Sequence, residues 1–275
     1  MKYKIKASYI NLDSSIERNE YLIRNINDVG MSPIFTRFPA VIGAHYWNAN
    51  NKLSKSELGC LLSHQHLLKE QNDDEFSLVI EDDVFLPTDF LANLNKVITM
   101  AHRHQPAMDV IFIGQTIDYR NIHKVKDLIR IHSEIDKNNK SGTYKFVLLE
   151  GKSWYKWGMF AYLVMPGAGK RISSLIESNT YLEQPIDNLI SLLIKDGKIH
   201  AKVVFPYLAG LSEAKTTMVD RKLNNSEIHT GLVNMFVHNG NPDKLIANAY
   251  RNLQSPEFNL NAFIYSQLIY QIITK

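Results

Sequence analysis

The sequence predicts an α/β fold, in which a mostly parallel central sheet is flanked by helices. Short apolar segments alternate with segments of helical periodicity, and this alternation is typical of parallel strands joined by crossover helices. The composition, 45% hydrophobic and 21% charged, is that of an ordinary globular protein. The 275 residues suffice for one large domain or two small ones, and a core of this size needs no disulfide.

Charge and cysteine usage exclude several classes of protein. A formal net charge of +3 excludes a strongly basic nucleic-acid binder. Cys60 is the single cysteine, so an internal disulfide is excluded and a reducing compartment is indicated. The first twelve residues alternate polar and apolar, unlike a signal peptide, and no run approaches the ~18 apolar residues of a membrane span. We therefore expect a cytoplasmic protein, or one resting on a membrane from the cytoplasmic side.

The chain begins with a strand, a turn and a helix. Residues 3–12 form the predicted strand, and Ser14 with Glu17 has the pattern of a capping box. Apolar residues at helical spacing follow, and Gly30 is a natural end for this helix. A second extended segment is predicted at residues 33–41.

A second capping box, Ser54 with Glu57, opens a helix that carries unusual residues. Gly59 costs a helix interior about 1 kcal/mol relative to alanine, which predicts close backbone packing or a ligand there. Cys60 and His64 are four residues apart and share a face, so they could form half of a zinc site. Zinc needs three or four ligands, and we favour a packed thiol and a hydrogen-bonded imidazole.

Three adjacent carboxylates, Glu81, Asp82 and Asp83, follow a short apolar run at residues 76–80. This run reads as a buried strand, and open α/β sheets bind ligands at the carboxyl ends of such strands. A divalent cation would balance the mutual repulsion of the carboxylates. Because side chains two apart share a face of an extended segment, we expect Glu81 and Asp83 to point together and Asp82 to point away. The alternative is a solvent-exposed acidic turn.

The middle of the chain is less regular. Residues 109–113 form another apolar strand, whereas the polar residues 116–143 read as a long surface excursion. Residues 144–149 are extended again. Aromatic residues then cluster at 154–157, where they can stack on a sugar ring or pack in the core.

Two further strands, at residues 159–165 and 198–205, complete the predicted sheet. The glycines of residues 166–170 resemble a phosphate loop, but their spacing fails its pattern, and a helix start is the better interpretation. Pro185 suits the first turn of another helix, where Asp187 is favoured by the helix dipole without any function.

The tail after residue 210 is predicted to be a helical C-terminal extension, residues 211–275, packed on a domain of residues 1–210. Lys215, Arg221 and Lys222 could face phosphates or lie in a solvated loop. The apolar stripe within 258–275 could dock on the domain or lie on a membrane, and its few basic residues favour docking.

Three motifs stand in a fixed order in the first third of the chain. They are Asn11-Leu12-Asp13 with Arg18, Glu57-Leu58-Gly59-Cys60 with Ser63-His64, and Glu81-Asp82-Asp83-Val84. This ordered set resembles glycosyltransferase family 25, which includes bacterial lipooligosaccharide galactosyltransferases and collagen galactosyltransferases. Weaker similarities follow at Gly158 with Ala161-Tyr162, at Ala168 and at Pro185-Ile186-Asp187. The resemblance covers residues 4 to 210.

The resemblance implies a nucleotide-sugar transferase of GT-A type fold that uses a UDP-sugar, often UDP-galactose. It also implies Mn²⁺ or Mg²⁺, inversion at the anomeric carbon, and an oligosaccharide acceptor on the lipid A core. Glu81 and Asp83 are then the expected metal ligands. The expected donor-binding residues are Asn11, Leu12, Arg18, Glu57, Ser63, His64 and Asp82.

An inverting transfer also needs a base that takes the proton of the acceptor hydroxyl. Asp187 is our candidate for this role and Glu183 is the second choice. One alternative is a non-catalytic nucleotide-sugar or carbohydrate-binding protein of the same fold. Another is a metal-dependent phosphohydrolase, which is disfavoured because a second set of Asp and His ligands is missing from the sequence.

Overall fold

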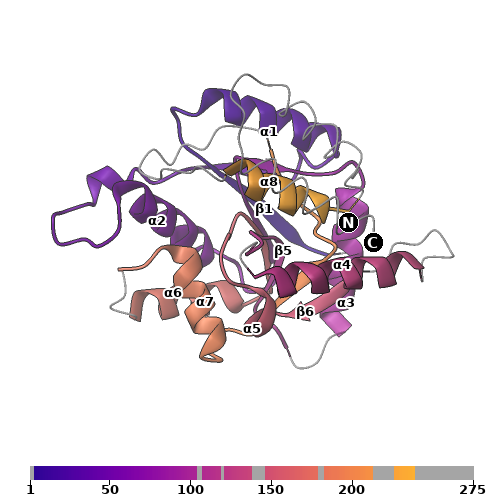
Figure 1. Ribbon diagram of the computed structural model, residues 1–275. Coiled ribbons are helices and arrows are strands. Elements are labelled where there is room, and N and C mark those ends of the chain that lie inside the picture. Colours follow the sequence, from indigo (N-terminus) through magenta and orange to yellow (C-terminus); the bar gives the residue numbers. More distant parts are fainter. Residues whose placement is uncertain are drawn as a thin grey trace, which may run out of the picture.

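The computed structural model describes residues 3–103, 107–118, 121–137, 146–178, 183–212 and 226–238. A seven-stranded sheet with the order β2-β1-β3-β7-β5-β8-β6 forms its centre (Figure 1). The strands are β1 Ile5–Asn11, β2 Phe35–Pro39, β3 Phe76–Glu81, β5 Val110–Gly114, β6 Val147–Glu150, β7 Ala161–Val164 and β8 Ala201–Phe205. All run in one direction except β7 and β6, which are antiparallel to their neighbours. The predicted α/β class with a mostly parallel sheet is confirmed.

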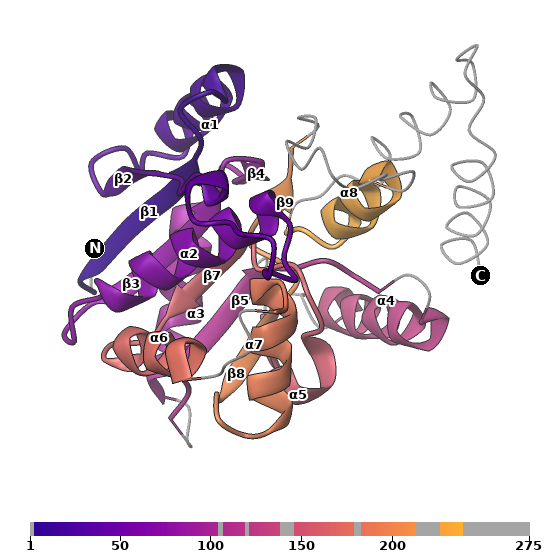
Figure 2. The same cartoon turned by 90° about the vertical axis from the view of Figure 1, so that its left-hand side faces the viewer.

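Helices cover both faces of this sheet. Helix α2 packs against α6 and α7 on one face, and α3 lies on the other (Figures 1 and 2). A small second sheet pairs β4 Val84–Phe85 with β9 Gly210–Leu211. The helices are α1 Ile16–Asp28, η1 Gly43–His45, α2 Lys55–Lys69, α3 Phe90–Arg103, α4 Ile122–Lys137, α5 Gly151–Trp154, α6 Ala168–Ser178, α7 Ile186–Lys195 and α8 Ser226–Met235.

The carboxyl ends of β1 and β3 meet at one edge of the sheet. These two strands are parallel, and their register pairs Ile10 with Glu81. Asn11, the last residue of β1, therefore lies beside the acidic triplet that follows β3. The sheet brings the first and third motifs of the sequence together.

Close backbone packing explains the glycine inside α2. A Cβ atom built on Gly59 would lie 2.5 Å from the carbonyl oxygen of Val41 and 2.9 Å from the backbone nitrogen of Gly43. The segment that contains η1 therefore packs directly on this turn of α2. Of the two predicted reasons for this glycine, backbone packing is confirmed.

The two predicted capping boxes differ in outcome. Ser54 and Glu57 form theirs, because the Ser54 hydroxyl accepts from the Glu57 backbone N–H while the Glu57 carboxylate accepts from the Ser54 N–H. The prediction of a capping box at Ser14 was wrong. The N-cap residue of α1 is Ser15, one residue later, and its side chain makes no capping hydrogen bond. A turn shifts the start, since the Ser15 N–H donates to the Leu12 carbonyl.

The expectation of an irregular excursion at 116–143 was wrong, because α4 lies within it. Val125, Leu128 and Ile135 are buried there at helical spacing, and they form an apolar stripe on an otherwise polar helix. The high content of Lys, His and Asp masked this stripe in the sequence. The predicted helix start within residues 166–170 is confirmed, since α6 begins at Ala168.

The aromatic residues at 154–157 do not form one stacking surface. Tyr155 is buried and stacks on Phe112 of β5, with 3.7 Å between ring centroids. Trp154 and Trp157 each carry a lysine ammonium over the ring, 4.4 Å from the centroid. Core packing is thus the observed role of the tyrosine.

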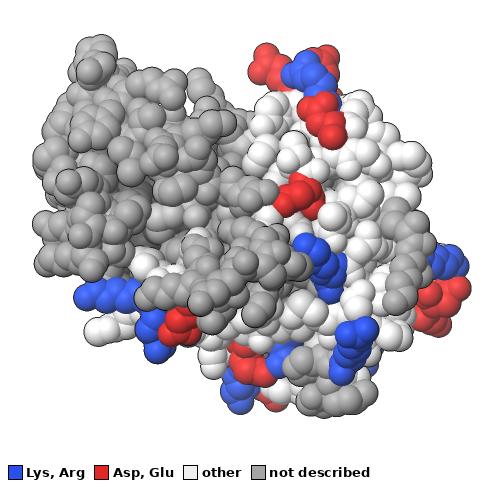
Figure 3. Space-filling model, turned by 90° about the vertical axis from the view of Figure 1, so that its right-hand side faces the viewer, with Lys and Arg blue, Asp and Glu red and all other residues white. Residues whose placement is uncertain are grey.

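Helix α8 packs on β9, where the Asn234 side chain bonds the backbone N–H and carbonyl of Leu211. Lys215, Arg221, Lys222 and the segment 258–275 lie outside the described residues. Among the helices that are described, none has both the length and the apolar character that crossing a membrane requires. On the face seen in Figure 3, the described acidic and basic side chains are interspersed, in keeping with the small net charge.

Candidate active site

Asn11 ties the ends of three strands together. Its side-chain N–H group donates to Asp82 Oδ2 at 2.7 Å and to the Ser15 carbonyl at 3.1 Å. Its Oδ1 accepts from Arg37 Nε of β2 at 2.9 Å. Every polar atom of this buried amide is therefore used, which fixes the turn between β1 and α1 against the acidic triplet.

Arg18 of α1 lies between two of the three carboxylates. One of its terminal nitrogens is 2.6 Å from Asp82 Oδ1 and 2.8 Å from Asp83 Oδ2. The guanidinium and the Asp82 carboxylate are both buried. Buried charges are tolerated only when they are paired, so the arginine allows two aspartates to lie in this interior position.

Asp83 keeps one unsatisfied oxygen. Its Oδ1 is buried and has no hydrogen-bond partner among the described residues. Burial, reinforced by the negative charge of Glu81, raises the pKa of Asp83 to about 7, although Arg18 opposes the shift. Burial likewise raises the pKa of Asp82 above its usual value, again against the attraction of Arg18. A cation next to the free oxygen would favour the ionised form of Asp83.

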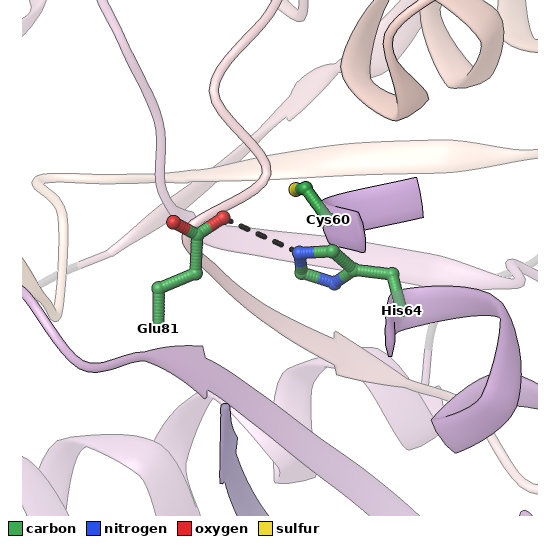
Figure 4. Close-up of side chains that lie close together, drawn as sticks. All are labelled: Cys60, His64 and Glu81. Atoms are coloured by element: carbon green, nitrogen blue, oxygen red, sulfur yellow. Dashed lines mark hydrogen bonds and ion pairs between the residues drawn. The ribbon is translucent and has the colours of Figure 1, made fainter. Parts of the chain in front are cut away.

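Glu81 turns away from the two aspartates and toward α2. Its Oε1 lies 3.3 Å from Nε2 of His64 (Figure 4). The other ring nitrogen of His64, Nδ1, lies 2.9 Å from the Tyr162 hydroxyl. Burial opposes ionisation of Glu81, but the hydrogen bond and charge of His64 outweigh it and lower the pKa of this carboxyl. An ionised carboxylate only accepts, so His64 Nε2 carries a proton and donates it in the hydrogen bond to Glu81.

The prediction that Glu81 and Asp83 point together while Asp82 points away was wrong. Glu81 faces His64, whereas Asp82 and Asp83 point together. Asp82 and Asp83 both bind Arg18, because β3 ends at Glu81 and the chain turns before the short strand β4. Alternation of side chains holds only within the extended segment.

The second motif contributes one side chain that faces the triplet and two that hold backbone in place. His64 contacts Glu81, whereas the Ser63 hydroxyl accepts from the Val41 N–H at 2.8 Å and donates to the Gly59 carbonyl at 2.7 Å. Glu57 caps α2. The Leu12 carbonyl likewise closes the turn before α1. Ser63, Glu57 and Leu12 thus hold the backbone that carries the polar cluster.

Asp187 lies in the first turn of α7. Its Oδ2 accepts from the backbone N–H of Gly158 at 3.3 Å, and its Oδ1 accepts from the Asn188 N–H at 2.8 Å. Glu183, the other base candidate, forms an exposed ion pair with Lys52 at 2.6 Å.

Tyr155 is buried in the neighbourhood of Asp187, Tyr162 and Glu81. Its hydroxyl is buried and has no hydrogen-bond partner within the part of the chain that the structure describes. Burial raises the pKa of Tyr155 well above its usual value, and the nearby Asp187, Tyr162 and Glu81 add to the shift. The phenol therefore stays neutral and can donate a hydrogen bond within this group of acidic side chains.

Sequence reasoning missed Arg37 and Tyr155 as parts of this cluster. Arg37 lies on an edge strand, and no local pattern marks it as the partner of Asn11. Tyr155 appeared only as one of several aromatic residues. Tyr162 was present in a weak motif, but its contact with His64 depends on β7 lying next to β3.

A sequence model described as "Glycosyltransferase family 25 (LPS biosynthesis protein)" matches residues 5–190. The chain belongs to glycosyltransferase family 25. The matched region contains all of the polar cluster described above and ends within α7. The family 25 match thus includes the strand ends, Arg18, the α2 motif and Asp187.

Two curated relatives agree with this assignment. A protein of Acanthamoeba polyphaga mimivirus that is named as a glycosyltransferase is 24% identical over 174 residues, 58% of this chain and 49% of the relative. Procollagen galactosyltransferase 1 of Danio rerio is 33% identical over 98 residues, 35% of this chain and 16% of that protein. The chain thus aligns with about half or less of the length of either relative.

Proposed function

We propose that this family 25 chain is a glycosyltransferase that moves a hexose, galactose first among the candidates, from a UDP-sugar to an oligosaccharide acceptor with inversion. The observation that carries the proposal is the buried cluster of Arg18, Asp82 and Asp83 at the carboxyl edge of β1 and β3. Ligands bind at this edge in α/β sheets. A degenerate binding protein would be free to lose such a costly group of charges.

The donor site is proposed to hold Mn²⁺ or Mg²⁺ through Asp83, whereas Glu81, the other expected ligand, faces His64 instead. The unsatisfied buried oxygen of Asp83 fits a cation, because a hard divalent ion prefers carboxylate oxygens. When bound, the cation would act as a Lewis acid that neutralises the charge developing on the departing pyrophosphate. Arg18 and Asn11 hold Asp82 and Asp83 in place, so the carboxylates need little reorganisation on binding.

Asp187 is proposed as the base that takes the proton of the acceptor hydroxyl. Inversion follows when that hydroxyl oxygen attacks the anomeric carbon opposite the departing UDP: the new C–O bond forms, the bond to the diphosphate breaks, and the proton moves to the base. The Gly158 N–H fixes the orientation of the carboxylate. Glu183 remains the second choice, because its ion pair with Lys52 is exposed to solvent.

The acceptor and location are proposed from the family. The description of the family model names LPS biosynthesis, so the acceptor is proposed to be a core sugar of lipooligosaccharide or lipopolysaccharide. The corresponding location is the cytoplasm or the cytoplasmic face of the inner membrane. Galactose is supported by the name of the Danio rerio relative. Residues 1–210 would form the catalytic domain and 211–275 a helical extension packed on it, as α8 packs on β9.

Release of UDP tests the proposal. The full chain is incubated with UDP-galactose, UDP-glucose and UDP-N-acetylglucosamine, with Mn²⁺ or with EDTA. Slow release from one donor, lost with EDTA and in Asp83→Asn, is the expected result. Asp28→Asn is the matched control, because Asp28 is an exposed carboxylate at the end of α1. No release from any donor, together with no binding of UDP, would instead support the non-catalytic alternative, and release of phosphate would indicate a phosphohydrolase.

A further inference from the structure

Cys60, His64 and Glu81 bring three different metal-binding groups to one point. The thiol and the imidazole lie on successive turns of α2 and face the carboxylate at the end of β3 (Figure 4). Their ligand atoms all lie within 4.8 Å of one another. Among the described residues, this is the one such group of three or more His, Cys, Asp or Glu side chains.

The distances suit a tetrahedral ion. Two nitrogen or oxygen ligands about 2.1 Å from a tetrahedral ion lie about 3.4 Å apart. His64 Nε2 and Glu81 Oε1 are 3.3 Å apart, which is long for a strong hydrogen bond. The Cys60 sulfur lies within 4.8 Å of both of these ligand atoms, and Cys60 is half-buried.

The surroundings of His64 fit a metal ligand. Its ring is buried, and its second nitrogen lies 2.9 Å from the buried hydroxyl of Tyr162. A metal on Nε2 requires the proton on Nδ1, and the Tyr162 hydroxyl oxygen can then accept a hydrogen bond from that N–H. Metal-binding histidines usually have such a partner on the other ring nitrogen, which orients the ring. The packing at Gly59 holds this turn of α2 rigidly.

We propose that Cys60, His64 and Glu81 form a site for Zn²⁺, distinct from the oxygen-ligand position at Asp83. A thiolate and an imidazole favour zinc over Mg²⁺ or Mn²⁺, which prefer oxygen ligands. The sequence alone offered two ligands of this set, and the third comes from the strand that packs beside α2. Three protein ligands leave the fourth position of a tetrahedral zinc ion for a water or a substrate oxygen.

Cobalt titration tests the site directly. Untagged full chain is stripped of metal with a chelator, dialysed, and titrated with Co²⁺ while the thiolate-to-cobalt charge-transfer absorption is followed. Cys60 is the only cysteine, so this absorption reports on that residue alone. We expect one equivalent of Co²⁺ to bind with this absorption and Zn²⁺, but not Mn²⁺, to displace it. Circular dichroism checks that each variant is folded.

The variants separate this site from simpler explanations. Cys60→Ser should abolish the absorption. Tyr162→Phe removes only the hydrogen-bond partner of His64 and should weaken Co²⁺ binding by ~10–100-fold. Glu81→Gln and His64→Gln each remove a proposed ligand and should weaken Co²⁺ binding by more than this. Asp83→Asn is the control and should leave the absorption unchanged. Absence of the absorption in the natural chain overturns the proposal, as does binding that is unaffected by Glu81→Gln and His64→Gln. The readout needs no UDP-sugar, so failure of the transferase proposal would not affect it.

Discussion

A terminal nitrogen of Arg18 lies 2.6 Å from Asp82 Oδ1, in the interior between α1 and the end of β3. The same nitrogen is 2.8 Å from Asp83. One cation thus serves two carboxylates, and Asn11 supplies the further hydrogen bond that Asp82 needs. The arrangement joins the first helix to the acidic turn and leaves one oxygen of Asp83 for another partner.

Removing the guanidinium should strongly destabilise the protein. In Arg18→Met the apolar stem is retained, but the buried Asp82 and the partly buried Asp83 lose their cation, and breaking a buried ion pair in this way costs about 3–5 kcal/mol. Urea unfolding at neutral pH measures the loss. Arg24→Met on the same helix is the control, because Arg24 is exposed and its change should cost less than about 0.5 kcal/mol. Equal losses for the two variants would show that Arg18 does not serve as the buried counter-ion.

Stability should fall with rising pH because of Asp83. Its pKa is about 7 in the folded chain and near the ordinary value of 3.8 when unfolded, so between these values the folded state binds more protons. The contribution of Asp83 to the free energy of unfolding is therefore most favourable at low pH and is lost as the pH rises through the folded-state pKa. The free energy of unfolding falls by at most about 1.4 kcal/mol per pH unit on account of this group. Asp82 acts in the same direction and Glu81 in the opposite one.

Comparison with Asp83→Asn isolates this effect. The free energy of unfolding is measured in EDTA from about pH 3 to about pH 8, across both pKa values. The advantage of the asparagine variant should grow with pH and level off above the folded pKa. Asp28→Asn, at an exposed position, is the control for the loss of one carboxylate charge. A difference between natural chain and Asp83→Asn that is constant with pH would contradict the raised pKa.

Asp187→Asn should abolish transfer while UDP-sugar binding is retained. The amide oxygen can still accept from the Gly158 N–H, so the local structure persists, but the group can no longer take a proton. A fall in kcat of about 10²–10⁴-fold is expected for loss of a general base. Asp196→Asn, at the other end of α7, should have normal turnover. Near-normal turnover of the Asp187 variant would remove Asp187 from this role.

Gly158→Ala should destabilise the loop that Asp187 holds. Gly158 has φ +87°, and an added Cβ would lie 2.4 Å from Thr116 Oγ1 and 2.5 Å from the Thr116 nitrogen. Gly197 has φ +72° with nothing within 4 Å of the added atom, so Gly197→Ala measures the backbone strain alone, about 1–2 kcal/mol. Urea unfolding should show a clearly larger loss for Gly158→Ala. Similar losses would mean that Thr116 can move away at little cost.

Local sequence patterns predicted the start of a helix correctly where the start depends on an interaction between residues within one turn. The Ser54–Glu57 box starts α2 because both partners lie within one turn. The box at Ser14 failed because a backbone turn and the Asn11 side chain hold the residues before α1 in a different conformation. The stripe of α4 was missed because its apolar residues are few among many charges.

The sequence by itself determined the α/β class, the position of the acidic triplet at the end of a core strand, and the face of α2 that Cys60 and His64 share. Each of these depends on residues close together along the chain. Tertiary structure alone decided which partner each carboxylate takes: Arg18 for Asp82 and Asp83, and His64 for Glu81. Such partners come from elements distant in sequence, and the packing of α1, α2 and β7 around β3 brings them within hydrogen-bonding distance.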